Sequence, residues 1–190
     1  MKKMMMLAAV LTWLPAAQSA GDPIPDSMGV CFDPAGTSHA ADVGLFTPFH
    51  AYLVVTNPTA PIDAFEFLVV RSNAASFVLS TNLGEGAVDS DAAADGYRVT
   101  RTTPYPVVGG VVVLVDWQWM LQSPCLLVYL GPGTDPLLPG GLPVLGHAGA
   151  YRLASIVSGS PQSAVALTDP SICWCADEPT SFGALKSLYR

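Results

Sequence analysis

Short apolar runs recur along the chain, and each is bounded by Gly, Pro, Asn or Asp. The runs are rich in Val, Phe, Tyr and Thr, which strands favour, and none shows a clear 3.6-residue period. Strands at this spacing without crossover helices predict one all-β domain, an antiparallel β-sandwich of jelly-roll or immunoglobulin-like type. About nine strands are predicted, over 29–33, 50–56, 64–71, 76–80, 97–103, 110–120, 125–130, 150–158 and 163–168.

Period-two alternation assigns the side chains of these runs to faces. In the run 64–71, Phe65 and Phe67 point one way, which leaves Glu66 pointing to solvent. In the run 110–120, a continuous apolar face predicts burial in the core rather than an exposed tryptophan platform for sugars. That face comprises Val111, Val113, Val115, Trp117 and Trp119.

The first twenty residues have the three parts of a secretory signal peptide. Lys2 and Lys3 precede an apolar run over 4–14, and small residues follow it, so that cleavage after Ser19 and cleavage after Ala20 both remain open. The apolar run is shorter than the roughly 20 residues that span a bilayer, and no later segment qualifies. We therefore expect a secreted, periplasmic or cell-surface protein without a membrane span after processing, with a sandwich domain over 21–176.

The C-terminal tail, 177–190, carries the pattern of a short helix. Thr180 or Ser181 can cap it. A helix of about ten residues is marginal in water unless it docks, so the tail is expected either to pack on its own domain or to bind a partner. The apolar face that would make the contact comprises Phe182, Leu185, Leu188 and Tyr189.

Composition and charge narrow the classes of partner. With 51% hydrophobic and 12% charged residues, the chain is too apolar to be intrinsically disordered. Without the leader, six Lys or Arg stand against fifteen Asp or Glu, a net charge of −9 that disfavours nucleic-acid binding. The segment 131–149 is dense in Gly and Pro and is predicted to be a long surface loop, where function often lies.

Four cysteines remain after processing, an even number as expected for disulfides in an oxidising compartment. Cys173 and Cys175 are separated by one residue, and a bridge between them would strain the preferred disulfide geometry. We therefore expect one of them to pair with Cys31 and the other with Cys125. The four thiols lack the paired spacing of a structural zinc site.

No motif in the sequence predicts catalysis. His39, His50 and His147 do not form a zinc-binding pair, and neither a nucleophile elbow nor a phosphate-binding loop is present. His50 is interpreted as a surface residue at a strand end. A carboxylate-dependent hydrolase remains an alternative. Its catalytic carboxylates would lie around Asp116 and in the 131–149 loop region.

One acidic segment is a weak candidate for calcium. Asp89, Asp91 and Asp95 could supply the hard oxygen ligands that calcium prefers. Ala93 stands where a ligand is needed, and no Glu closes the loop. No other cofactor is expected.

The stretch 51–70 resembles the opening of cohesin-type sandwiches. There, too, a strand such as 52–57 leads through a loop to an aromatic-rich strand such as that around Phe65 and Phe67. The resemblance implies a nine-stranded jelly-roll that binds partner modules on cell-surface assemblies. The cysteines and the C-terminal tail depart from that pattern, and the resemblance transfers no binding residue.

Together these features favour a secreted, non-enzymatic module that binds an extracellular protein or carbohydrate, or builds a surface structure. The alternatives are the hydrolase and a structural assembly subunit.

Overall fold

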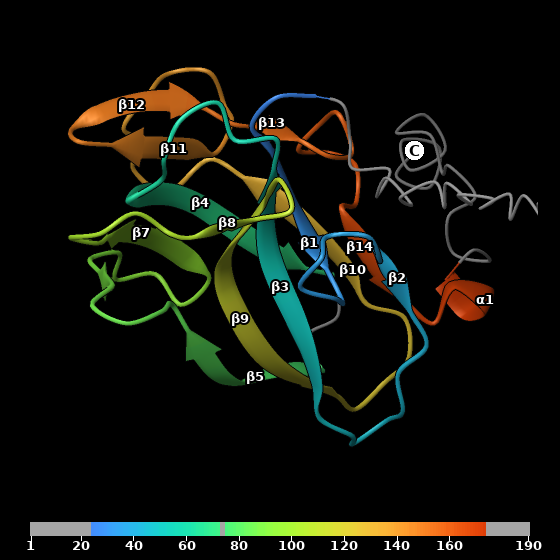
Figure 1. Cartoon of the computed structure of the whole chain (residues 1–190). Helices are drawn as coiled ribbons and strands as arrows, with labels where there is room; N and C mark the ends of the chain where they lie inside the picture. Colours follow the sequence, from blue (N-terminus) through green and yellow to red (C-terminus); the bar gives the residue numbers. More distant parts are fainter. Residues whose placement is uncertain (1–23, 73–74, 174–190) are drawn as a thin grey trace, which may run out of the picture.

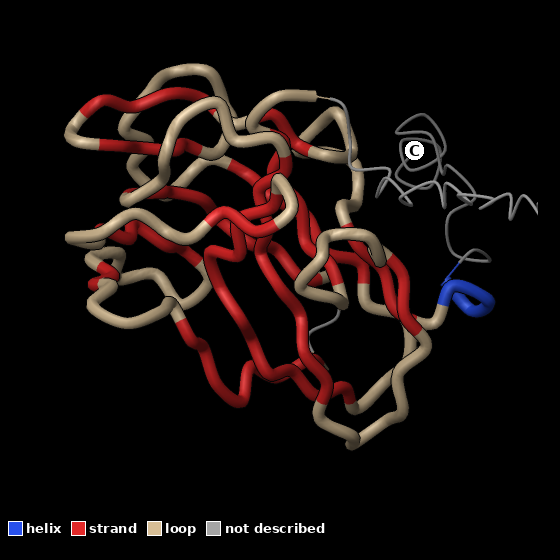
Figure 2. Tube along the Cα trace, viewed as in Figure 1, coloured by secondary structure: helices blue, strands red, loops and turns tan. Residues whose placement is uncertain are grey.

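The computed structural model describes residues 24–72 and 75–173. Within these ranges the chain is almost entirely β, with fourteen strands and one four-residue helix, α1 (Pro170–Cys173). The strands form two sheets around one shared hydrophobic core (Figures 1 and 2). The predicted all-β sandwich is therefore confirmed.

The first sheet has six strands in the order β13-β1-β3-β9-β5, with β8 also paired to β9. All its neighbours are antiparallel except β1 and β13. Because β3 pairs along one edge of β9, strands β5 and β8 share the other edge. The strands are β1 (Ser27–Cys31), β3 (Phe49–Thr56), β5 (Ser76–Asn82), β8 (Val107–Val108), β9 (Val111–Leu121) and β13 (Ser155–Ile156).

The second sheet has eight strands, in the order β12-β11-β4-β10-β14-β2, with β7 paired to β4 and β6 to β7. Strands β14 and β2 run parallel, as β1 and β13 do, so each sheet of the predicted antiparallel sandwich contains one parallel pair and is mixed. The strands are β2 (Ala40–Ala41), β4 (Ala64–Arg71), β6 (Val88–Asp89), β7 (Gly96–Thr100), β10 (Leu127–Gly131), β11 (Val144–His147), β12 (Ala150–Leu153) and β14 (Ala166–Thr168).

The core is held by aromatic side chains from both sheets. Phe67 of β4 stacks on Tyr97 of β7 at a centroid distance of 4.7 Å, and Trp117 of β9 meets both rings edge-on. The Trp117 indole N–H donates a 2.9 Å hydrogen bond to the Tyr97 hydroxyl, which satisfies a polar atom that burial would otherwise destabilise. Trp117 and Trp119 are fully buried, so the prediction that the tryptophans of this strand belong to the core is confirmed.

A β-bulge changes the face of two residues in β9. The pairing of β3 with β9 shifts between Leu53 and Val54, and Leu114 is the extra residue. A bulge adds one residue and thereby reverses the alternation beyond it. Val115 keeps the core orientation of the tryptophans, whereas Val111 and Val113 face outward and are half-buried. The prediction that all five residues share one face is therefore wrong for these two valines.

The predicted strand 64–71 is found with its predicted ends, whereas the other predicted strands have shifted ends and the run 150–158 is divided between β12 and β13. Strand β11 lies inside the segment predicted to be a loop, where Val144 and Leu145 are buried. The predicted signal peptide and the predicted tail helix, with Phe182, Leu185, Leu188 and Tyr189, lie outside the described residues. In the described ranges no helix is long and apolar enough to cross a membrane.

Candidate functional site

An apolar groove of about 480 Å³ lies on the outer face of the first sheet, between a loop that follows β1 and the β8–β9 hairpin. The hairpin turn consists of Gly109 and Gly110, whose φ angles of 61° and 82° fit the two-residue turns in which both central residues have positive φ. The bulge at Leu114 supplies the floor, because it turns Val111 and Val113 outward. The lining residues are Pro34, Ala35, Pro106, Val108, Gly109, Val111 and Val113.

The opposite wall of the groove is a loop folded around Asp33. Its carboxylate accepts hydrogen bonds from the Thr37 amide and hydroxyl and from the Ser38 amide. Burial alone would raise the pKa of Asp33, but these donors outweigh it and lower the pKa below the ordinary 3.8. Gly36 (φ 72°) closes the turn over Val54, so the loop holds Pro34 and Ala35 against the sheet.

A second hollow, of about 250 Å³, adjoins the groove and shares Pro106 and Val113 with it. Strands β8 and β5 share one edge of β9, but no described strand pairs with that edge at residues 113–115. The hollow opens at this gap. The Arg101 guanidinium lies 4.7 Å from the centre of the Tyr105 ring and donates through Nε to the Glu85 carbonyl. Burial raises the pKa of Tyr105 to about 12, so its hydroxyl stays protonated and donates to the Leu83 carbonyl.

Polar side chains continue the same face beyond the hollow. His50 Nδ1 lies 2.7 Å from Asp116 Oδ1, and the His50 ring stacks on Tyr52 at 5.9 Å. Burial, followed by the charges of Asp116 and Asp33, raises the pKa of Tyr52. His50 is exposed at the start of β3, as predicted. Asp116 is thus a surface residue in hydrogen-bond contact with His50 on the rim of the hollow.

The cysteine arrangement matches one of the two expected pairings in part. Cys125 and Cys173 form a disulfide with a Cα–Cα distance of 5.1 Å, which ties α1 to the start of β10. Cys31 is a buried free thiol. Its expected partner in that pairing, Cys175, lies outside the described residues.

Cys31 and His39 are neighbours, but burial disfavours the thiolate of Cys31. His39 Nδ1 is 2.9 Å from the Val30 carbonyl oxygen and 3.4 Å from Cys31 Sγ. Because a carbonyl only accepts, Nδ1 carries the proton, and the nitrogen that could accept a proton from the thiol is Nε2, 3.8 Å from Sγ. Burial, and then the charge of Asp33, raises the pKa of Cys31 to about 12.

This burial predicts an unreactive thiol. In a Cys175→Ser variant, the reaction of Cys31 with Ellman's reagent at about pH 8 is expected to be at least about 100-fold slower in the folded chain than in guanidinium, because both access and thiolate fraction are low. The release of thionitrobenzoate measures the rate. If Cys31 reacted as fast in the folded chain as in guanidinium, the burial of its thiol would be contradicted.

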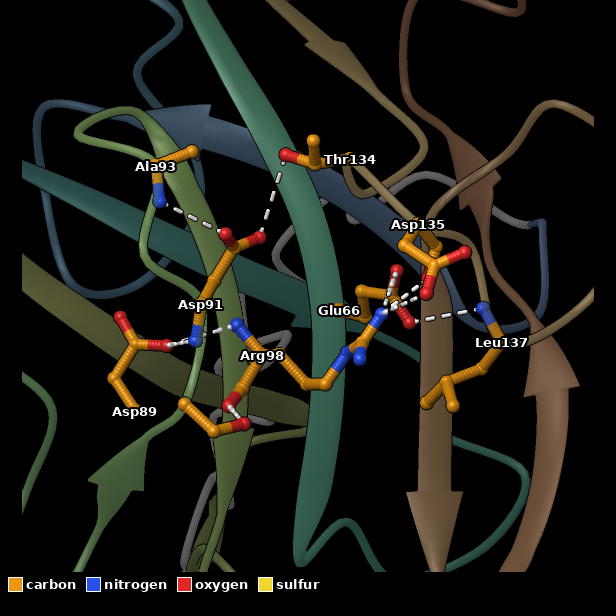
Figure 3. Close-up of polar contacts among 9 residues, drawn as sticks. Glu66, Asp89, Asp91, Ala93, Arg98, Thr134, Asp135 and Leu137 are labelled. Carbon is orange, nitrogen blue, oxygen red and sulfur yellow. Dashed lines mark hydrogen bonds and ion pairs between the residues drawn. The ribbon is translucent and has the colours of Figure 1, made fainter.

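Glu66 is fully buried, so the prediction that it points to solvent is wrong. It does face away from the core, but the segment after β10 folds over it (Figure 3). The Leu137 amide donates a 3.1 Å hydrogen bond to one carboxylate oxygen, and Arg98 Nη2 lies 3.5 Å from the other. Arg98 also donates to the Asp135 carbonyl. Glu66 and Arg98 therefore fasten the Gly- and Pro-rich segment to the outer face of β4 and β7.

The aspartates of the calcium candidate do not converge. Asp95 pairs with Arg71 at 2.8 Å, while Asp89 accepts from the Asp91 and Arg98 amides. Asp91 accepts from the Ala93 amide and lies near Thr134 (Figure 3). Within the described ranges, no group of three or more His, Cys, Asp or Glu is placed to hold a metal ion. These carboxylates instead shape the turn before β7.

The groove was missed at the sequence level, although part of its signal is visible there. Two glycines between the valine runs 107–108 and 111–113 indicate a tight hairpin. The bulge that turns Val111 and Val113 outward has no such mark, since residues 111–115 form a continuous apolar run.

The sequence matches no protein family, and no curated protein sequence matches it significantly. Among solved structures, a cohesin module of a family 33 glycoside hydrolase from Clostridium perfringens is 13% identical, with a TM-score of 0.44 over 68% of this chain and 90% of that one. The sixth cohesin of Acetivibrio cellulolyticus scaffoldin B, solved in complex with a dockerin, is 10% identical, with a TM-score of 0.47 over 70% of this chain and 95% of that one. The resemblance to cohesins is thus a weak likeness of fold.

Proposed function

We propose that this chain is an exported, non-enzymatic β-sandwich module that binds a protein through the groove between the Asp33 loop and the β8–β9 hairpin. The observation that supports it is the apolar lining of the groove, which contains no charged side chain. Val108 of the lining is 75% exposed, and its neighbour Val107, 52% exposed, extends the apolar surface beyond the rim. Exposed apolar patches of this kind mark interaction sites on soluble proteins.

The chemistry of the lining favours a protein over a carbohydrate. Sugar sites combine aromatic faces with hydrogen-bonding side chains, whereas the groove is lined only by Val, Pro, Ala and Gly. Trp117 and Trp119 are buried and cannot provide a stacking platform. A partner would seat aliphatic or aromatic side chains in the groove.

The carboxylates of Asp116 and of the 131–149 segment, together with Glu66 beneath that segment, do not support a catalytic role. Glu66 is sealed beneath the segment after β10, and Asp135 is exposed at its surface. Asp116 is paired with His50. A general acid must reach its substrate in an open pocket, and the buried Glu66 does not.

The proposal predicts the effect of a charge in the groove. Val108→Asp is expected to lower partner binding at least about tenfold, because a carboxylate would be desolvated against apolar side chains. It should also lower the fluorescence of the neutral apolar dye Nile red bound to the protein. The measurement compares biotinylated wild-type and variant chains in pull-downs from the cell-surface and culture proteins of the source.

Val88→Asp is the matched control, since Val88 is 63% exposed on a two-residue strand of the other sheet. It is expected to bind as the wild type does. Equal capture by the wild type and Val108→Asp, or no captured protein at all, would refute the proposal. Capture of glycans instead of proteins on an array would assign the module to the other partner class.

A further inference from the structure

Strand β5 differs from the other strands at the sheet margins. In the described ranges, the marginal strands β2, β6, β8 and β13 have two residues each, and β12 has four, among them Arg152. Short length and charge are the devices by which proteins protect sheet edges from pairing. Strand β5 has seven residues and no charged side chain. It lies at the margin of the first sheet, with β9 as its strand neighbour (Figure 1).

Three consecutive exposed side chains of β5 are apolar. Phe77, Val78 and Leu79 are 40%, 37% and 45% exposed. Ser80, Thr81 and Asn82 complete the exposed strand. An uncharged, apolar edge of this length is a template for another strand. The bulge at Leu79 increases its twist but leaves residues on both sides paired with β9.

We propose that β5 pairs with β5 of a second copy of this chain, in antiparallel orientation, so that the two first sheets become one continuous sheet. Identical strands in antiparallel pairing satisfy a twofold axis, which is the commonest symmetry of homodimers. Because β5 is uncharged, pairing with itself brings no like charges face to face, although each chain has a net charge of −9 without its leader.

The register with β9 fits this pairing. Phe77, Ser80 and Asn82 lie opposite Met120, Gln118 and Asp116, and so share the outer face, while Val78 and Thr81 share the inner one. An axis between Leu79 and Ser80 places Phe77 opposite Asn82 of the partner subunit and Val78 opposite Thr81 of the partner subunit. Both pairs then lie on matching faces, as antiparallel pairing requires.

The experiment is sedimentation velocity on the purified chain without its first twenty residues. The wild type is expected to sediment as a dimer at micromolar concentration. Its dissociation constant should fall at least about twofold when the salt is raised from about 0.05 to 0.5 M, because salt screens the repulsion of two acidic chains. Leu79→Lys and Leu79→Glu alone should each raise the dissociation constant at least about tenfold, and an equimolar mixture should restore the dimer.

Val88→Lys controls for an added charge elsewhere and should remain dimeric. Ser80→Lys is a second edge variant at an exposed polar position and should also dissociate. A wild-type chain that stays monomeric, a dimer unaffected by the Leu79 and Ser80 variants, or a mixture that does not reassociate would each overturn the proposal. None of these results bears on the groove, whose test uses Val108.

Discussion

Replacement of Arg152 by Met is expected to lower the free energy of unfolding by about 3 kcal/mol at neutral pH. Arg152 of β12 makes a two-pronged contact with Asp26, through Nε and Nη2, each at 3.0 Å. Asp26 also accepts from the amide and hydroxyl of Thr59 and is 7% exposed. Methionine keeps the apolar stem but leaves a buried carboxylate without its cation. Urea unfolding followed by tryptophan fluorescence measures the loss.

The contact between Asp26 and Arg152 also predicts how the loss of stability in Arg152→Met depends on pH. Burial alone would raise the pKa of Asp26, but the hydrogen bonds from Arg152 and Thr59 outweigh it and lower the pKa below 3.8. A carboxyl whose folded pKa is lowered stabilises the fold above its unfolded pKa, and the contribution disappears as the pH falls through the folded pKa. The difference between wild type and Arg152→Met should therefore be full at pH 7 and shrink in acid below the unfolded pKa of about 3.9.

A matched comparison separates the buried pair from an exposed one. Asp26→Asn should destabilise strongly, whereas Asp95→Asn should cost less than about 1 kcal/mol, because Asp95 is 43% exposed in its pair with Arg71. Equal losses for the two asparagine variants, or a loss for Arg152→Met that does not change with pH, would contradict the role assigned to the Asp26 pair.

The sequence was sufficient to predict the fold class, because burial of one face of each strand imposes a two-residue period of apolar side chains that is visible in the sequence. The strand 64–71 was predicted with its observed ends, and the tryptophans of β9 were assigned to the core, since period-two alternation follows directly from strand geometry. The two-residue strands β2, β6 and β8 were missed, because their pairing comes from neighbours in space rather than from their own residues.

The errors share a physical cause, which is that tertiary contacts far apart in the sequence decide the environment of a strand face. Alternation correctly placed Glu66 on the side of β4 opposite Phe65 and Phe67, but it cannot reveal that a Gly- and Pro-rich segment folds over that side. Likewise the bulge at Leu114 depends on how β3 meets β9, and it decides whether Val111 and Val113 form core or groove. The groove therefore became visible only when the strands were in place.

Glu66→Ala is expected to release the segment 131–143 and to lower the free energy of unfolding by about 2–4 kcal/mol. The carboxylate accepts from the Leu137 amide and faces Arg98, and its removal leaves both donors without this acceptor in a covered site. Arg98 Nε already has no partner within the described ranges, so the guanidinium gains no compensation. Thermolysin, which cleaves before leucine unless proline follows that leucine, should cut before Leu137 at least about tenfold faster than in the wild type.

Two further variants make this prediction specific. Gly133→Ala should loosen the segment too, since a Cβ atom there would lie 2.1 Å from a Glu66 carboxylate oxygen. Asp135→Ala should leave both the unfolding midpoint and the cleavage rate unchanged, because the Asp135 carboxylate is 96% exposed and 4.0 Å from Arg98. If Glu66→Ala and Asp135→Ala resisted thermolysin equally well, the segment would be held by its own backbone rather than by the buried carboxylate.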